Sequence, residues 1–187
     1  MPIYRLDNVI QPYAWGSKTA IAQLLGQPNP AQLPQAELWM GTHPKGPSTV
    51  VAGDERVPLQ QLIERQPMDI LGRYVVRRFG QALPYLFKVL AAAQPLSIQA
   101  HPSKRQAIEG FDREKRQGKA LDAPDRNYRD ANHKPEIICA LTPFWGLNGF
   151  RTPAEAVDLL TPVCPQELDQ ALRDLKTHRG QGLKSFF

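Results

Sequence analysis

The chain has 187 residues, which is room for one domain or for one domain with a large insertion. Its hydrophobic content of 42% and charged content of 22% are ordinary for a soluble globular protein. No apolar run approaches the roughly 20 residues that span a bilayer, and the N-terminus lacks the charged-then-apolar order of a signal peptide. The sequence therefore predicts a cytoplasmic protein with no membrane partner.

The chain carries a formal net charge of +5 and has a pI of about 9.4. A net positive charge favours the binding of a nucleic acid or of a phosphorylated small molecule. The basic residues of 104–119 alternate with Glu109, Asp112 and Glu114, which favours a solvated helix face. The sequence also lacks the interleaved aromatics and motifs of nucleic-acid binders, so no nucleic-acid partner is expected.

The first predicted elements are an extended segment and a short helix. Ile3–Trp15 has an extended pattern, and Gly16 provides the bend that ends it. Ser17 is a typical N-cap for a helix over Lys18–Leu25, and Gly26 is well placed to end that helix. Periodicity and turn residues then predict, in chain order, strands over 36–41 and 49–52, two short helices within 59–79 broken at Pro67, and a strand over 85–91.

The stretch 95–102 places polar side chains at every second position. In a strand, Ser97, Gln99 and His101 would share one face, with Ile98 and Ala100 on the other. A buried amide and imidazole each need a partner, and a metal ion is one such partner. This stretch therefore predicts a strand over 96–100 with a polar, metal-binding face.

The second half of the chain is predicted to contain more helix. Ser103 and Gln106 have the spacing of a capping box, so a helix is expected directly after Pro102. The remaining predictions are a solvated loop over 117–133, strands over 135–141 and 144–150, a helix capped by Thr152, a helix over 165–176, and the opening turn of an amphipathic helix at Leu183, Phe186 and Phe187.

Three residues could together hold a metal ion. Gln99, His101 and Glu136 offer an amide oxygen, an imidazole nitrogen and a carboxylate oxygen, a donor set that suits zinc. If their strands are neighbours, three protein ligands and a water would make a Lewis-acidic site. The alternative is that Gln99 and His101 form local hydrogen bonds and that Glu136 is a surface carboxylate.

Other polar residues lie in apolar surroundings. Lys88 and Glu37 each interrupt an apolar strand, so each must reach a charge or extend to solvent. Lys134 is either a solvated loop charge or a cation beside the metal site. Trp15 and Trp39 are core aromatics by default, although an indole also forms a wall for a sugar or phosphate.

The sequence resembles the type I mannose-6-phosphate isomerase family. Several stretches carry the resemblance in the order in which the family has them: Tyr13-Ala14-Trp15-Gly16-Ser17, Ala36-Glu37-Leu38-Trp39-Met40-Gly41-Thr42-His43-Pro44, Leu86-Phe87-Lys88-Val89-Leu90, Pro95-Leu96-Ser97-Ile98-Gln99-Ala100-His101-Pro102 and Tyr128-Arg129-Asp130-Ala131-Asn132-His133-Lys134-Pro135-Glu136. Together they cover residues 1 to about 160. The resemblance favours the metal site over local hydrogen bonding.

The resemblance implies a fold and an activity. The fold would be mainly β with a helical insertion (α+β), a cupin-type jelly roll that is incomplete in this chain. Residues 1–151 would form the partial N-terminal catalytic portion and 152–187 the start of the helical insertion. The activity would be that of a zinc-dependent aldose-ketose isomerase, which interconverts the sugar phosphates mannose 6-phosphate and fructose 6-phosphate.

The resemblance also implies roles for individual residues. Gln99, His101 and Glu136 match family zinc ligands, and Lys134 matches a position discussed for proton transfer. The substrate pocket would be lined by Trp15, Glu37, Lys88 and Ser97.

The expected site is incomplete, and that leaves alternatives open. By the resemblance, the fourth ligand of the single Zn²⁺, a catalytic arginine and a second cupin lie beyond Phe187. The chain could then be an N-terminal portion of the isomerase, possessing an unfinished site. Alternatively, it could be a non-enzymatic cupin-like module that binds metal or a sugar phosphate. A small basic nucleic-acid binder is a third reading, supported by net charge alone.

Overall fold

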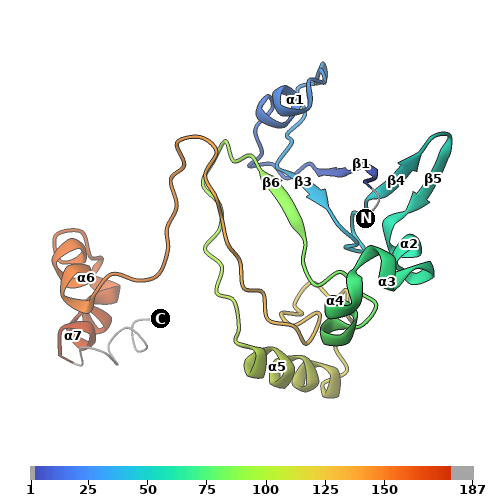
Figure 1. Cartoon of the computed structure of the whole chain (residues 1–187). Helices are drawn as coiled ribbons and strands as arrows, with labels where there is room; N and C mark the ends of the chain where they lie inside the picture. Colours follow the sequence, from blue (N-terminus) through green and yellow to red (C-terminus); the bar gives the residue numbers. More distant parts are fainter. Residues whose placement is uncertain (1–2, 178–187) are drawn as a thin grey trace. The chain divides into compact units, whose positions relative to one another are not determined.

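The computed structural model describes residues 3–177 and divides the chain into two units, Met1–Ser97 and Ile98–Phe187. The first unit holds two small antiparallel sheets with short helices, and the second holds helices and long extended segments (Figure 1). The amphipathic turn predicted at 183–187 lies outside the described residues. Within 3–177, no helix is long and apolar enough to cross a membrane.

The first sheet has the strand order β1-β4-β5, with β1 at Arg5–Asp7, β4 at Thr49–Ala52 and β5 at Glu55–Pro58. Val50, in the central strand, is 2% exposed. Gly53 adopts a φ of 61° in the two-residue connection between β4 and β5, a conformation that glycine reaches without strain. The strand predicted over 49–52 is confirmed, whereas β5 was not predicted.

The second sheet has the order β2-β3-β6, with β2 at Val9–Gln11, β3 at Glu37–Met40 and β6 at Phe87–Leu90. Leu38 lies opposite Val89 in the register and packs with Ile21 and Ala91 in the hydrophobic core. Because side chains alternate along a strand, the neighbours of Leu38 on β3 point to the other face. This alternation confirms the strands predicted around Glu37 and Lys88 and gives β3 one apolar and one polar face.

Helix α1 (Ala20–Leu25) ends at Gly26 as predicted but begins later than predicted, with Thr19 and not Ser17 at the N-cap position. The Ser17 hydroxyl accepts hydrogen bonds from the backbone N–H groups of Thr19 and Ala20 at 3.2 and 3.1 Å. Gly26 ends the helix in the left-handed conformation, with a φ of 62°. The helix starts two residues later than predicted because Ser17 caps it from outside the first turn.

The region 59–79 forms three helices where two were predicted. They are α2 (Leu59–Arg65), α3 (Pro67–Ile70) and α4 (Gly72–Phe79). Pro67 occupies the first position of α3, where its missing N–H costs no helical hydrogen bond. Gly72 has a φ of 77°, which bends the chain between α3 and α4.

The helices of the second unit begin at the predicted caps. Both α5 (Lys104–Arg116) and α6 (Pro153–Leu160) start with complete capping boxes, built by Ser103 and Thr152. After α6 come a short 3₁₀ turn, η1 (Gln166–Leu168), and α7 (Asp169–Thr177), which buries Leu172 and Leu175. The described residues thus combine small sheets with helices, in agreement with the coarse α+β class, but more of them lie in helices than in strands, so the prediction of a mainly β chain is wrong for this part.

The strands predicted over 96–100, 135–141 and 144–150 are wrong for the described residues. These segments are extended, but none pairs with a strand within residues 3–177. Ile98 is 85% exposed and Ile137 is 99% exposed, so the expected apolar faces cover nothing here. A strand needs hydrogen-bonded neighbours as well as alternating side chains, and the alternation alone misled the prediction.

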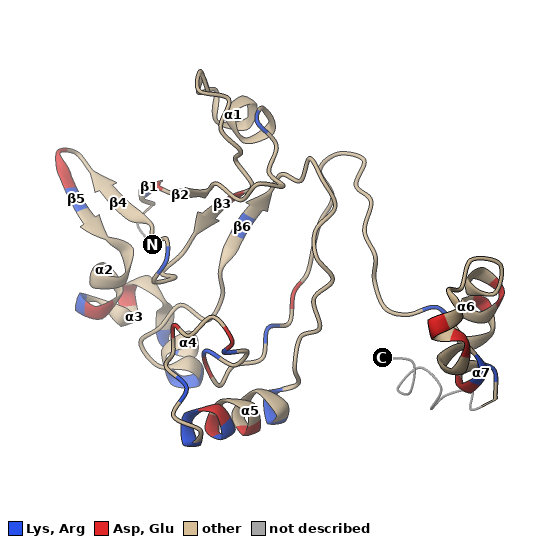
Figure 2. Cartoon of the chain, turned by 180° about the vertical axis from the view of Figure 1, so that it is seen from behind, with Lys and Arg blue, Asp and Glu red and all other residues tan. Residues whose placement is uncertain are grey.

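Glu114 of α5 anchors the loop that follows the helix. Its side chain is buried, and its carboxylate accepts hydrogen bonds from the backbone N–H groups of Asn127 at 3.2 Å and Tyr128 at 2.8 Å. The buried Arg126 guanidinium donates to the Tyr128 carbonyl at 2.8 Å. Charges of both signs mark the rest of α5, as predicted (Figure 2). The prediction was wrong for Glu114, which faces inward.

Acid is expected to destabilise the second unit through Glu114. Hydrogen bonds from the Tyr128 and Asn127 backbone hold the pKa of this carboxyl below its usual 4.5, against the opposing effect of burial. A folded-state pKa lowered in this way stabilises the fold above the unfolded pKa, and the gain is lost as pH falls through the folded pKa. We expect the free energy of unfolding, followed by helix circular dichroism in urea, to decrease below about pH 4.5.

A pair of variants isolates the contribution of Glu114 to this acid sensitivity. Glu114→Gln should flatten the pH dependence, while Glu109→Gln, which alters an exposed residue on the same helix, should leave it unchanged. If the free energy of unfolding depends on pH equally in Glu114→Gln and in the unsubstituted chain, the Glu114 carboxylate is not the source of the acid sensitivity.

Candidate metal and substrate site

The predicted substrate residues lie in the first unit and the predicted metal ligands in the second. On the polar face of the second sheet, the indole Nε1 of Trp39 donates a hydrogen bond to Oε2 of Glu37 at 2.6 Å. The register sets Lys88 directly opposite Trp39, and its ammonium lies 3.5 Å from both carboxylate oxygens of Glu37. The ammonium also lies 5.9 Å from the centre of the Trp39 ring.

These contacts explain two polar residues that interrupt apolar strands. The Glu37 side chain is only 10% exposed, so its charge needs partners that offset the cost of leaving water. The Trp39 N–H and the Lys88 ammonium provide them, and the latter remains 33% exposed and open to a ligand. Of the two alternatives predicted for Lys88, contact with a charge or extension to solvent, the structure shows the contact with a charge. The sequence analysis treated Trp39 as a core aromatic and missed its contact with Glu37, although the period of two along β3 could have indicated it.

Aromatic residues lie next to this polar face. The ring centres of Tyr13 and Trp15 are 5.7 Å apart, and the His43 ring contacts the Trp39 ring edge-on at 4.6 Å. Burial raises the pKa of the Tyr13 hydroxyl, and the negative charge of Glu37 raises it further. Tyr13 and His43 are therefore additional candidates that the sequence analysis did not assign to the site.

A close backbone approach fixes the segment that carries Trp15. The Trp15 carbonyl accepts a hydrogen bond from the Ala93 N–H at 2.9 Å, and the Ser17 N–H donates to the Ala91 carbonyl at 2.7 Å. Between them, a Cβ placed on Gly16 would lie 2.5 Å from the backbone nitrogen of Ala36. Only glycine fits here, so the segment can lie flat against the second sheet.

In the second unit, two predicted metal ligands approach each other. His101 Nδ1 lies 3.9 Å from Glu136 Oε2. This separation is too long for a hydrogen bond. It exceeds by about 0.5 Å the about 3.4 Å expected for two tetrahedral ligands of one zinc ion. An imidazole and a carboxylate are both donors that zinc accepts, so the pair is a candidate part of a metal site.

The other predicted site residues of this region are exposed. Gln99, Lys134 and Ser97 all lie on extended segments with solvent-accessible side chains. Within residues 3–177, no three His, Cys, Asp or Glu side chains are grouped to hold a metal ion. Gln99 lies two positions before His101 in the sequence, and its amide is the predicted third donor.

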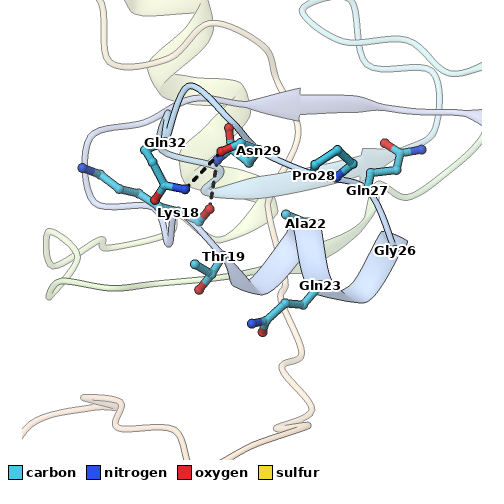
Figure 3. Close-up of a pocket in the computed structure, with 9 residues that line it drawn as sticks. All are labelled: Lys18, Thr19, Ala22, Gln23, Gly26, Gln27, Pro28, Asn29 and Gln32. Carbon is cyan, nitrogen blue, oxygen red and sulfur yellow. Dashed lines mark hydrogen bonds between the residues drawn. The ribbon is translucent and has the colours of Figure 1, made fainter.

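A pocket of about 370 Å³ in the first unit does not involve any predicted site residue (Figure 3). It lies between α1 and the loop that follows it. Asn29 donates to the Lys18 carbonyl at 2.9 Å, and Gln32 donates to the Asn29 carbonyl at 3.1 Å. Both side-chain amides thus donate to backbone carbonyls of the segments that line the pocket.

The chain is similar to proteins of known activity. A family model described as the catalytic domain of type I phosphomannose isomerase matches residues 3–153. The mannose-6-phosphate isomerase of Salmonella typhimurium is 54% identical over 160 residues, which are 85% of this chain and 41% of that protein. The human mannose-6-phosphate isomerase is 42% identical over 199 residues, covering 98% of this chain and 44% of that protein.

A solved structure has the same fold. The mannose 6-phosphate isomerase of Salmonella typhimurium, bound to fructose 6-phosphate and zinc, superimposes with a TM-score of 0.87 and 48% sequence identity. The match covers 98% of this chain and 46% of that chain. The present chain therefore spans less than half the length of the relatives that it matches.

Proposed function

The chain belongs to the type I phosphomannose isomerase family, and from this premise we propose that it supplies zinc- and substrate-binding residues for the interconversion of mannose 6-phosphate and fructose 6-phosphate. We also propose the finer architecture that the family resemblance implies. Residues 1–151 would belong to a cupin-type jelly roll, and 152–187 would begin a helical insertion.

One observation carries the functional proposal. Solved variants of the Salmonella typhimurium enzyme replace a lysine, a histidine and a glutamate. Lys88, His101 and Glu136 are separated along this chain by the same intervals as those three residues. The approach of His101 to Glu136 at 3.9 Å agrees with a shared role.

The proposed zinc site consists of three donors. Gln99, His101 and Glu136 would hold the ion through oxygen, nitrogen and oxygen donors. Zinc, when bound, supplies a Lewis acid that stabilises negative charge on the oxygens of the reacting sugar. The two donors that approach each other come from separate segments, so binding would also fix these segments to one another.

The remaining residues would bind the sugar phosphate and move a proton. Lys88 keeps its ammonium partly exposed above Glu37 and can form charge-assisted hydrogen bonds with a phosphate or a sugar hydroxyl. Trp15 offers an apolar wall, and Ser97 offers a hydroxyl donor. Moving the carbonyl between C1 and C2 requires a proton to leave one carbon and return to the other. The exposed amine of Lys134 is the proposed carrier of that proton.

A coupled assay tests the proposed function. The chain, within a protein of its relatives' full length, is incubated with mannose 6-phosphate, zinc is added or removed with a chelator, and fructose 6-phosphate is detected. We expect zinc-dependent turnover, and Lys88→Met should weaken substrate binding by roughly 10- to 150-fold because a charged hydrogen bond contributes about 1.5–3 kcal/mol. Arg65→Met, a change at an exposed residue at the end of α2, is the control that should leave turnover unchanged.

The outcomes separate the proposal from the binding-module alternative. Zinc-dependent turnover would exclude a non-enzymatic module. Binding of zinc and of mannose 6-phosphate without turnover would instead favour that module. Absence of both zinc binding and turnover would contradict the proposal.

A further inference from the structure

Lys104 joins the two segments that carry the candidate metal ligands. It is the first residue of α5, three positions after His101. Its ammonium donates to the Ala131 carbonyl at 3.0 Å and to the Asn132 side-chain oxygen at 3.1 Å. Asn132 lies four positions before Glu136, so one side chain connects the surroundings of both ligands.

Both ends of this connection are fixed locally. On the α5 side, Ser103 accepts a hydrogen bond from the Gln106 N–H, and the Gln106 side chain accepts one from the Ser103 N–H at 2.9 Å. On the loop side, the Asn132 N–H donates to Oδ1 of Asp130 at 2.8 Å. Lys104 thus connects a capped helix start with a closed turn, neither of which can shift freely.

The two segments run side by side beyond this connection, as both views show (Figures 1 and 2). On these segments, His101 Nδ1 lies 3.9 Å from Glu136 Oε2. The extended segments around the two ligands have no strand pairing within the described part of the chain. Within the described residues, no strand ladder fixes the register of these segments, and the two hydrogen bonds of Lys104 connect them instead.

We infer that Lys104 is a positioning residue that sets the separation of His101 and Glu136 and thereby the affinity for zinc. The inference rests on the proposed zinc role of those two ligands. Lys104 itself does not ligate the metal, since an ammonium has no lone pair to give. It acts by holding the loop that ends at Glu136 against the start of α5.

The positive charge of Lys104 and its proposed positioning role predict opposite effects of Lys104→Met on the affinity for zinc. A positive charge near a cation disfavours its binding, so removal of the charge alone would raise the affinity for zinc. Loss of positioning would lower it. The direction of the change in Lys104→Met therefore separates a positioning role from a simple electrostatic one.

The experiment compares the chain with Lys104→Met and with Lys115→Met, which alters another exposed lysine of α5. Zinc affinity is measured by competition with a chromogenic chelator. Backbone order parameters of residues 131–136 are measured by ¹⁵N relaxation in the metal-free chain. We expect Lys104→Met to lower the zinc affinity by about 10-fold and to reduce the order parameters from about 0.85 toward about 0.6, whereas Lys115→Met should change neither.

Each other outcome overturns the inference in a recognisable way. Unchanged or higher zinc affinity in Lys104→Met would exclude a positioning role. Lower affinity with unchanged order parameters would show that Lys104 acts by some route other than holding the loop. If the unsubstituted chain binds no zinc, the proposed function fails and the metal role of Lys104 with it, while the order parameters still report whether Lys104 holds the loop.

Discussion

His101→Ala is expected to lower the zinc affinity of the chain by at least about 100-fold, because loss of a direct ligand exceeds the 10–100-fold effect of removing a supporting residue. The imidazole lies 3.9 Å from the Glu136 carboxylate, and its removal leaves the carboxylate and the Gln99 amide as weak oxygen donors. Competition with a chromogenic chelator at constant pH measures the loss.

Two further variants define the specificity of this result. Glu136→Gln should cause a loss of the same order, because a neutral amide replaces a charged donor. His133→Ala removes an exposed imidazole from the same loop and should leave the affinity within about twofold, as expected for a surface change. Equal losses in His133→Ala and His101→Ala would indicate non-specific zinc binding and would contradict the assigned ligands.

Gly16→Ala is expected to destabilise the first unit by about 2–3 kcal/mol, the upper part of the range of about 1–3 kcal/mol for forcing atoms into a filled space. The added Cβ would lie 2.5 Å from the nitrogen and 2.6 Å from the Cα of Ala36. Both atoms belong to the backbone of the segment entering β3, so neither can rotate away. Urea unfolding followed by tryptophan fluorescence reports on this unit, because Trp15 and Trp39 lie in it and Trp145 is already 97% exposed.

Gly53→Ala is the matched control for Gly16→Ala. Nothing lies within 4 Å of a Cβ placed there, so its cost arises from the φ of 61° alone. That cost is about 1 kcal/mol. A loss for Gly16→Ala no larger than the loss for Gly53→Ala would mean that the contact with Ala36 relaxes easily.

Local signals in the sequence predicted the parts of the fold that depend on neighbouring residues. The caps at Ser103 and Thr152 and the left-handed end of α1 at Gly26 are confirmed, because each involves atoms only a few residues apart. The period of two around Glu37 and Lys88 likewise predicted their strands. The same period failed over 96–100 and 135–141, where no partner strand lies in the described chain.

The candidate site was predicted less completely than the secondary structure. The resemblance supplied the roles of Gln99, His101 and Glu136, and the structure brings the latter two within 3.9 Å. The inward orientation of Glu114 and the donation of the Trp39 indole to Glu37 depend on contacts across a loop and along a sheet face. The spacing of residues along the sequence does not indicate which of several charged side chains forms such a contact.

The register of β6 beside β3 has a consequence for the order of folding. β2, α1 and β3 can associate early, whereas β6 joins them only when the chain closes a long loop, as the 51-residue separation of Lys88 from Glu37 shows. Docking of β6 adds Val89 to the apolar face of β3 and Lys88 to its polar face in one event. We therefore expect the core and the charged pair to be completed in the same kinetic step, so that a slow closure delays both.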